Sequence, residues 1–267
     1  MTTIYPRPKK ALGQNFLTDN NIVAKILTAA DIQPEDHVLE VGPGRGALTN
    51  LLTRQAKKLV CVEFDRELAE ILRQQYKDNH QVTIHEQDIL KVDFASLLGE
   101  ATGNWKVVAN LPYNISTPVL FRFLEERKRF SRLVLMLQKE VGERLSASPG
   151  SGDYGIITVL LGLWFEVKKE FLVASNCFYP APKVDSVVIS LVPRKQPLAE
   201  VKDEQFFRQV VKASFAQRRK TLHNCLKAAR LAEPDKLSLA FEKSGIDGKR
   251  RGETLSIAEF AELAQQF

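Results

Sequence analysis

A glycine turn and an acidic residue stand at the ends of two consecutive apolar runs. Val38–Val41 leads into the turn Gly42–Gly46, and Glu63 ends the next run, 21 residues after Gly42. Glycines after a strand let backbone N–H groups approach a ligand, and a carboxylate at Glu63 can accept hydrogen bonds from both hydroxyls of a ribose. The pattern predicts a site for a ribose-containing cofactor, with a tight turn that binds nothing as the alternative for the glycines alone.

The neighbouring residues must decide which cofactor this is, because the turn also fits the dinucleotide motif G-x-G-x-x-A. Glu40 places a carboxylate inside the first strand, where it suits a sulfonium and an ammonium group better than a pyrophosphate. Asp88 ends the third run and can accept a hydrogen bond from an adenine amine. With the Asn-Leu-Pro-Tyr box that ends the fourth run, these residues predict S-adenosylmethionine, held by Gly42, Glu63 and Asp88.

That box, Asn110-Leu111-Pro112-Tyr113, carries the catalytic chemistry. Pro112 stiffens the turn and holds Leu111 extended, so the Asn110 side-chain oxygen and the Leu111 carbonyl can accept both hydrogens of an exocyclic amine. Tyr113 offers a face for base stacking, worth about 1–3 kcal/mol. Methyl transfer to such an amine needs positioning and electrostatics rather than a nucleophilic side chain. A plain loop turn is disfavoured at this strand end.

An alternation of strands and helices must position these residues. Short apolar runs separated by helical patterns predict a mostly parallel sheet of βαβ units. Five strands are predicted, at His37–Val41, Leu59–Glu63, Val82–His85, Lys106–Ala109 and Leu133–Leu137; helices are predicted after Asp19 and at Asp65–Tyr76, Thr117–Arg127 and Ile156–Leu163. Two later β segments, Trp164–Val173 and Val184–Val192, are expected as a hairpin on the sheet edge.

The composition changes after Val192, where a linker with prolines and charges precedes purely helical patterns. The fold class is therefore α/β: a Rossmann-like methyltransferase domain at residues 1–194, with a small all-α domain at 195–267. From Arg194 onward there are 15 basic and 10 acidic residues, which accounts for most of the net charge of +6. This imbalance favours a polyanionic partner, such as RNA, at the C-terminal domain, although a solvated helical surface would look similar.

Other classes of site are disfavoured. The three cysteines are widely spaced and the four histidines scattered, so we expect neither a metal site nor a disulfide framework. No apolar run reaches the length of a membrane span, and the polar, proline-containing segment Met1–Lys10 is unlike a signal peptide. The sequence thus predicts a cytoplasmic protein, and without an evident exposed apolar stripe we expect a monomer.

Beyond these local patterns, the chain resembles the ribosomal RNA adenine N6,N6-dimethyltransferases over nearly its whole length, most closely the bacterial branch that acts on small-subunit rRNA. The likeness is carried by five segments: Lys9–Leu17, Glu40–Thr49, Asn110–Tyr113, Phe178–Ser186 and Phe215–Leu222. No functional position departs from the family pattern.

The resemblance implies roles that the residues alone do not. Asn15 and Leu17 would contact the methionine part of the cofactor, and Asn110 would serve both cofactor and catalysis. Phe178 would stack on the target base, although an aromatic before a Pro-x-Pro turn is as often a core residue. The implied substrate is two adjacent adenosines in a hairpin near the 3′ end of small-subunit rRNA, in a partly assembled particle.

Alternatives for the function remain open at this point. One is a relative that methylates large-subunit rRNA and confers antibiotic resistance; another is a DNA adenine methyltransferase. A third is a non-catalytic RNA-binding factor, which would not need Asn110 or Tyr113. An oxidoreductase ranks last, because no candidate His or Lys stands near the glycine turn.

Overall fold

The computed structural model describes residues 5–99 and 103–267, so the first four residues of the N-terminal segment discussed above lie outside it. Packing divides the chain into two compact units. The first comprises residues 1–142 and 168–193, and the second comprises residues 143–167 and 194–267. The chain therefore crosses between the units three times, and the last crossing lies beside the expected boundary at residue 194.

The first unit is built on a seven-stranded sheet with the order β4-β3-β2-β5-β6-β9-β7. Neighbouring strands from β4 to β6 run parallel, and β9 runs antiparallel to β6. The expected α/β class with a mostly parallel sheet is thus confirmed. The strands are β2 (His37–Val41), β3 (Lys58–Glu63), β4 (Val82–Glu86), β5 (Trp105–Asn110), β6 (Phe130–Gln138), β7 (Phe165–Val173) and β9 (Ser186–Pro193).

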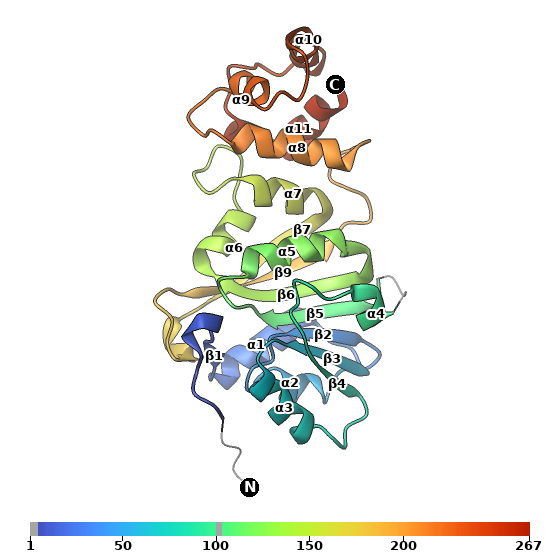
Figure 1. Ribbon diagram of the computed structural model, residues 1–267, viewed down its shortest axis with the longest axis vertical. Coiled ribbons are helices and arrows are strands. Elements are labelled where there is room, and N and C mark those ends of the chain that lie inside the picture. The colour runs from blue at the N-terminus through green and yellow to red at the C-terminus, as the bar shows by residue number, and fades with distance from the viewer. Residues whose placement is uncertain (1–4, 100–102) are drawn as a thin grey trace. The chain divides into compact units, whose positions relative to one another are not determined.

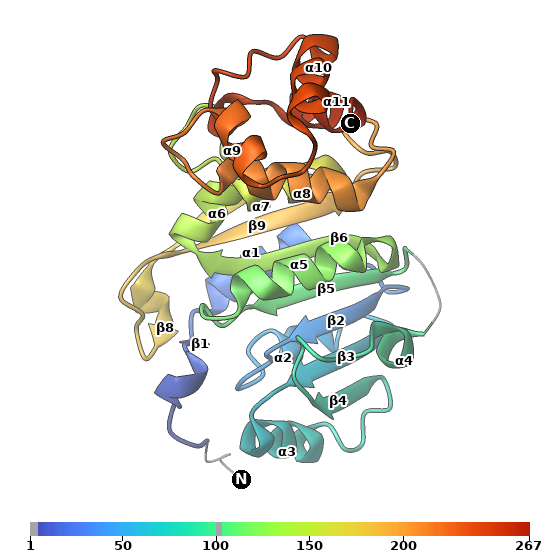
Figure 2. The ribbon, with the colours of Figure 1, turned by 45° about the horizontal axis from the view of Figure 1, so that its top comes forward.

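Helices cover both faces of this sheet, and Figure 2 shows α5 in front of β5 and β6 with α1 behind them. Apolar residues of α1 and α2 pack with one face of the central strands, among them Val38, Cys61 and Val108. On α4, α5 and β6, three phenylalanine rings meet at centroid distances of 5.5 to 6.3 Å. The helices are α1 (Asn20–Ala30), α2 (Thr49–Leu52), α3 (Arg66–Gln75), α4 (Phe94–Leu98), α5 (Ser116–Glu125) and α6 (Lys139–Leu145).

Aspartates fix where the longer helices of this unit begin. The Asp19 carboxylate accepts hydrogen bonds from the backbone N–H groups of Asn21 and Ile22 at the start of α1. Asp65 accepts in the same way from the N–H of Glu67 at the start of α3. Such caps satisfy N–H groups that have no partner within the helix. The helices α2, α4 and α6 were not predicted, because elements this short show no helical periodicity.

A second, two-stranded sheet joins distant parts of the chain. In it β1 (Phe16–Leu17) runs antiparallel to β8 (Phe178–Tyr179), with Leu17 opposite Phe178. The peptide bond between Tyr179 and Pro180 is cis. The two strands expected as a hairpin, β7 and β9, are neighbours at the edge of the seven-stranded sheet. The segment that connects them contains β8 and returns to the N-terminal region to pair with β1. Short 3-10 turns occur at Lys10–Leu12, Arg127–Arg129, Ser175–Cys177 and Gly252–Thr254.

The second unit is helical apart from the first residues of β7, and Figure 1 shows its C-terminal helices in orange to red. It contains α7 (Ile156–Trp164), α8 (Glu204–Phe215), α9 (Leu222–Ala228), α10 (Pro234–Ser244) and α11 (Ile257–Gln265). Buried residues Phe207, Val211 and Phe260 contribute to its core. The expected helical C-terminal region is thus present, and the short helix α9 is an addition to it.

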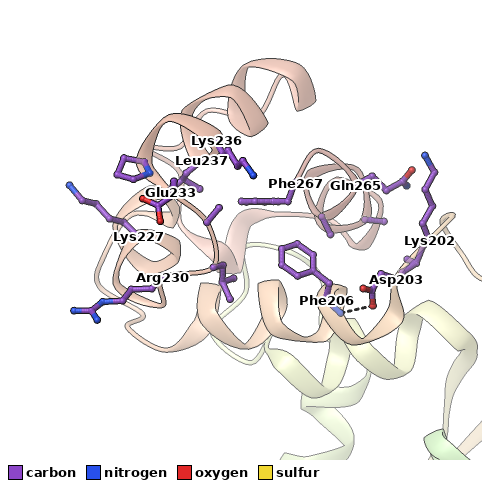
Figure 3. A pocket seen from close by; sticks show the side chains of 16 residues that line it. Lys202, Asp203, Phe206, Lys227, Arg230, Glu233, Lys236, Leu237, Gln265 and Phe267 are labelled. Atoms are coloured by element: carbon purple, nitrogen blue, oxygen red, sulfur yellow. Dashed lines mark hydrogen bonds between the residues drawn. The ribbon is translucent and has the colours of Figure 1, made fainter.

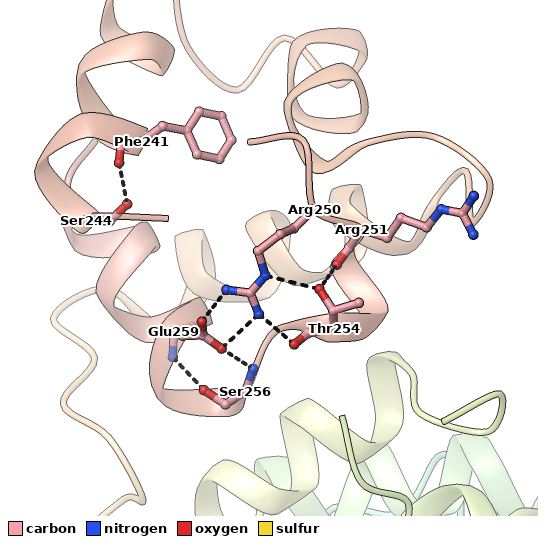
Figure 4. A network of polar contacts seen from close by, with 7 residues as sticks. All are labelled: Phe241, Ser244, Arg250, Arg251, Thr254, Ser256 and Glu259. Atoms are coloured by element: carbon pink, nitrogen blue, oxygen red, sulfur yellow. Dashed lines mark hydrogen bonds and ion pairs between the residues drawn. The ribbon is translucent and has the colours of Figure 1, made fainter. Parts of the chain in front are cut away.

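A polar network fixes one loop of this unit (Figure 4). Arg250 donates to both carboxylate oxygens of Glu259 and to the backbone carbonyl of Thr254. Ser256 and Glu259 form a reciprocal capping box at the start of α11. Because Glu259 accepts hydrogen bonds from Arg250 and Ser256, its pKa falls to about 2. Arg250, the middle one of three consecutive basic residues (Lys249, Arg250 and Arg251), is therefore held by contacts within the protein.

Candidate functional site

The strand ends of the first unit surround a cavity of about 210 Å³. Contributions come from the turn after β2, the ends of β3 and β5, the loop after β4, and the segment before and within β1. Because parallel strands end at the same edge of a sheet, residues far apart in sequence meet there. The predicted site residues among its lining are Asn15, Leu17, Gly42, Glu63, Asp88, Asn110, Leu111 and Tyr113.

The glycine turn has the backbone that the sequence implied. Gly42 and Gly44 have φ values of 66° and 59°, a conformation that favours glycine. A Cβ on Gly44 would also lie 3.0 Å from the Phe16 ring, so the turn packs closely against β1. The Gly44 N–H donates to Glu63 Oε2 at 2.9 Å. The turn and the strand-ending acid are thus locked together before any ligand binds.

Glu63 is buried and held by the backbone on both of its oxygens. Its Oε1 accepts from the Asp65 N–H at 2.8 Å, while Oε2 accepts from Gly44. Burial nevertheless raises the pKa of this carboxyl above its usual value. A carboxylate has further lone pairs beyond these two bonds, so it can still accept from ligand hydroxyls.

Glu40 is the most unusual group in the cavity lining. It is 1 % exposed, and its Oε1 has no hydrogen-bond partner among the described residues. Its Oε2 accepts a long hydrogen bond from Cys61 Sγ at 3.6 Å. Burial raises the pKa of Glu40 to about 7. An unpaired buried carboxyl is costly, so this site would be stabilised by a cation or a donor nearby.

The segment before β1 is tied to the end of β3 by side chains that sequence reasoning did not single out. Lys9 Nζ and Gln14 Nε2 both donate to the Asp65 carboxylate, each at 2.8 Å. The Lys9 contact and the Gln14 contact lower the pKa of Asp65 despite its desolvation. These bonds position the backbone of Asn15 beside the strand ends. A polar segment distant in sequence gives no signal of this pairing.

The Asn110–Tyr113 box is anchored at each of its main positions. Asn110 Nδ2 donates to the Asn15 carbonyl at 3.0 Å, and the Leu111 N–H donates to the Met136 carbonyl of β6 at 3.2 Å. The Tyr113 hydroxyl hydrogen-bonds to Ser186 Oγ at 2.7 Å, and burial raises the pKa of Tyr113. Only the tertiary structure shows that Ser186 positions this ring.

Two further residues alter the predicted picture of the site. Asp88 has its Oδ1 engaged by the Leu90 N–H at 3.0 Å, and Oδ2 lies 3.9 Å from Lys91 Nζ.

Phe64, which directly follows Glu63, lines the cavity and is 61 % exposed. Phe64 was not among the predicted site residues, although an aromatic residue immediately after the strand-ending acid is a usable signal.

Phe178 is placed differently from the other predicted site residues. Its side chain is 4 % exposed and packs in the hydrophobic cluster with Leu17 and Val23, and it is not part of the cavity lining. Its neighbour Tyr179 is 56 % exposed. Since Phe178 pairs with the cavity residue Leu17, it lies next to the cavity without facing it.

Comparisons with known proteins agree with this geometry. The family described as ribosomal RNA adenine dimethylase matches residues 6–267. The chain belongs to the ribosomal RNA adenine dimethylase family. It is therefore an S-adenosylmethionine-dependent methyltransferase that acts on adenine in ribosomal RNA, as the sequence analysis expected.

Relatives and solved structures extend this similarity. The chain is 54 % identical over 261 residues to the ribosomal RNA small subunit methyltransferase A of Geobacter metallireducens, covering 97 % of this chain and 95 % of that protein. A dimethyladenosine transferase from Plasmodium falciparum has a TM-score of 0.75 at 26 % identity, covering 93 % of this chain and 95 % of its own. The 23S rRNA methyltransferase ErmE has a TM-score of 0.70 at 25 % identity, covering 94 % and 99 %.

The cavity fits the family's cofactor. Two backbone-held carboxyl groups and a glycine turn are suited to a ribose and to a ligand with cationic groups, and the unpaired Oε1 of Glu40 lies in the same lining. Within residues 5–99 and 103–267, no group of His, Cys, Asp and Glu side chains is arranged to hold a metal ion. Likewise, no helix in these residues combines the length and apolar character that a membrane crossing requires.

Proposed function

We propose that this chain dimethylates the N6 amines of two adjacent adenosines in a hairpin near the 3′ end of small-subunit rRNA. One observation carries the proposed mechanism. The Asn110 side chain lines the same cavity as Gly42 and Glu63, with its Nδ2 already donating to the Asn15 carbonyl. This bond leaves Oδ1 as the atom of Asn110 that can accept from an incoming amine.

Asn110 and Leu111 would orient the target amine together. The N–H of Leu111 donates to the Met136 carbonyl on β6, so Leu111, whose own carbonyl belongs to the next peptide, is tied to the central sheet. With Asn110 Oδ1 and the Leu111 carbonyl each accepting one hydrogen, the nitrogen lone pair is directed away from the base ring. A rigid sheet holds such acceptors with little reorganisation, which is the main source of electrostatic catalysis.

The cofactor-binding residues would be Asn15, Leu17, Gly42, Glu63 and Asp88, with part of the site also formed by Asn110. Glu63 is suited to the ribose hydroxyls, and Asp88 to the adenine amine. The cofactor supplies a methyl group on a sulfonium ion. With its two hydrogens held by Asn110 Oδ1 and the Leu111 carbonyl, the adenine N6 would be oriented to accept that methyl group, which would leave the cofactor as a neutral thioether, and the N6 proton would go to water. None of the chain's side chains needs to form a covalent bond.

Tyr113 and Phe178 would hold the target base. The hydrogen bond from Tyr113 to Ser186 fixes the tyrosine ring at the cavity. Phe178 would complete the sandwich by turning out of its hydrophobic cluster when the base enters. Phe178 pairs with Leu17 in the two-stranded sheet, and Leu17 lines the cavity, so Phe178 stays beside the cavity. The base must first leave its stack in the RNA to reach this pocket.

Similarity to relatives supports the choice of substrate. The relative from Geobacter metallireducens, named for the small subunit, shares 54 % identity, whereas the large-subunit enzyme ErmE shares 25 %. We propose a partly assembled small ribosomal particle as the partner, residues 1–194 as the catalytic domain and 195–267 as an RNA-binding domain. The enzyme would act in the cytoplasm as a monomer.

Transfer of labelled methyl groups from S-adenosylmethionine tests this function. Immature small subunits, large subunits and duplex DNA are assayed in parallel, and the modified nucleosides are identified. We expect dimethyladenosine in the small-subunit sample alone. Label in large subunits or in DNA would retain the chemistry and reject the proposed target.

A further inference from the structure

We propose that a pocket within the C-terminal helices binds one unstacked nucleotide of single-stranded RNA, separately from the adenosine that is methylated. The pocket lies between α8, α10 and α11 and has a volume of about 850 Å³. All of its lining belongs to residues 201–267, so the second unit forms it alone. The inference rests on the proposed function in one respect: it takes the negatively charged polymer that this pocket binds to be RNA.

The floor of the pocket is aromatic and apolar. The rings of Phe206 and Phe267 meet edge to face with centroids 5.3 Å apart, and Figure 3 shows both rings inside the hollow. Leu237 and Ala261, both buried, complete this floor. Aromatic side chains on a concave surface suit a planar base, and every base has a face that can stack on them.

The rim of the pocket is positively charged. Four cationic residues line it, and within residues 5–99 and 103–267 none of them forms an ion pair: Lys202, Lys227, Arg230 and Lys236. In Figure 3, Lys227 and Arg230 extend from one edge and Lys202 from the opposite edge. Cations on two sides of an aromatic floor can follow a phosphate backbone whose base points inward.

The two acidic groups of the lining do not cancel this charge. The Asp203 carboxylate caps α8 by accepting from the Phe206 N–H at 2.9 Å, so it is engaged with the helix N-terminus. Glu233 supplies the second acidic side chain among the described residues that line the pocket. Four cations against two carboxylates leave an excess that favours an anionic ligand.

The backbone at Arg230 adopts an uncommon conformation. Arg230 has a φ of 51°, in the left-handed region where a helix end usually has glycine. An arginine there keeps a long cation at the pocket rim in spite of an unfavourable backbone conformation. A residue held in such a conformation is a reason to look for a function at that place.

The shape of the pocket selects a single strand. In a duplex the bases are paired and stacked, so a base cannot enter a concave aromatic pocket; in loops and bulges it can. The ligand class is therefore a nucleotide in single-stranded RNA, and an acidic peptide is the competing outcome.

Photo-crosslinking and binding to an oligouridine hexamer test the inference in the full chain. Uridine has no exocyclic amine, so the hexamer does not present the group that Asn110 would orient. One 4-thiouridine is placed in the hexamer, and the crosslinked residue is identified by mass spectrometry. We expect crosslinks at Phe206 or Phe267. Crosslinks confined to the strand-end cavity or to other surfaces would overturn the proposal.

Matched variants distinguish stacking from folding defects. Phe206→Leu should weaken hexamer binding about 5- to 100-fold, because it keeps an apolar side chain but removes the aromatic face. Phe241→Leu, in the same unit but outside the pocket lining, should leave binding unchanged. Equal weakening by both variants would contradict the proposal.

The charged rim is tested by the salt dependence. Lys227→Gln combined with Arg230→Gln should reduce the slope of log affinity against log salt by about 1.4, as expected for two lost phosphate contacts on a single strand. Lys212→Gln combined with Lys243→Gln, two exposed lysines outside the pocket, is the control. Displacement of the hexamer by polyglutamate at comparable affinity would favour a protein partner and reject the nucleotide.

These outcomes are separable from those of the proposed function. If the wild-type chain crosslinks through the pocket but does not methylate small subunits, the proposed substrate is wrong and the pocket inference stands. If it methylates small subunits while Phe206→Leu binds the hexamer normally, the pocket inference is wrong and the proposed function stands.

Discussion

The strand-end cavity and the C-terminal pocket differ in how far their polar side chains are hydrogen-bonded within the protein. In the cavity, Glu63 and Asn110 are held by backbone partners within the protein. In the pocket, the cations Lys227 and Arg230 are exposed and extend from the rim. The first region is preorganised for one small molecule, whereas the second offers adjustable charge to a flexible polymer.

The same contrast separates the basic residues of the second unit. Arg250 is engaged by Glu259 and Thr254, and Arg218 donates to the Gly152 carbonyl at 2.6 Å. The two runs of consecutive basic residues, 218–220 and 249–251, therefore each contain an arginine held by internal contacts and an exposed lysine. The lesson is that a run of charges indicates a binding surface only after its internal partners are known.

The sharpest test of preorganisation is Asn110→Ala. Removing one fixed acceptor for the amine should lower turnover on small subunits by about 10²- to 10³-fold, by analogy with the loss of one orienting hydrogen-bond group. Single-turnover methylation measures this, and calorimetry should show that S-adenosylmethionine still binds. Asn21→Ala, at an exposed position on α1, is the control. Wild-type turnover in Asn110→Ala would reject the proposed mechanism.

Glu63→Ala should separate cofactor binding from chemistry. Loss of hydrogen bonds between a carboxylate and the ribose hydroxyls is expected to weaken S-adenosylmethionine binding about 10- to 100-fold. Turnover at saturating cofactor should change much less. Because Glu63 also holds the Gly44 N–H, thermal melting must accompany the titration. Unchanged affinity in a folded variant would remove Glu63 from the cofactor site.

The buried Glu40 carboxyl, whose Oε1 has no hydrogen-bond partner among the described residues, should make cofactor binding depend on pH. Its pKa is raised to about 7 by burial, so the free protein holds a proton there at lower pH. A cationic ligand favours the carboxylate, and affinity should therefore rise about tenfold between pH 6 and pH 8. The unliganded chain should lose stability as the pH rises toward 7, because the folded state binds this proton more tightly. A Glu40→Gln variant should show neither dependence.

The smallest effect is expected for the structural arginine. Arg250→Ala should lower the free energy of unfolding by about 1 kcal/mol, since the ion pair with Glu259 is about one-third exposed and partly screened. Lys249→Ala, at the neighbouring exposed position, should change it by less than about 0.5 kcal/mol. Glu259 has its pKa lowered to about 2, so the Arg250 contribution should be lost as the pH falls from about 4.5 toward 2. Chemical denaturation at several pH values measures both.

The sequence by itself predicted the seven strands of the main sheet, the glycine turn after β2, and the position of the Asn110–Tyr113 box at the end of β5. Each is a contiguous stretch of the sequence. Because the carboxyl ends of parallel strands share one edge of the sheet, an apolar strand that leads to Gly42 or Asn110 places that residue at this edge. Asp19 was predicted as a helix cap because capping depends on neighbours two or three residues away, whereas Asp65, predicted as the first residue of its helix, is the cap of α3. The family resemblance added Asn15 and Leu17, whose roles no local pattern encodes.

Only the tertiary structure decided the contacts between distant segments. Ser186 lies against Tyr113, Lys9 and Gln14 hold Asp65, and Phe178 lies in a hydrophobic cluster, all across large sequence separations. The grouping of residues 143–167 with the C-terminal helices is of the same kind. So is the C-terminal pocket, whose cations are scattered from Lys202 to Lys236. Local propensity cannot encode such pairings, because they depend on which faces are buried together when the whole chain packs.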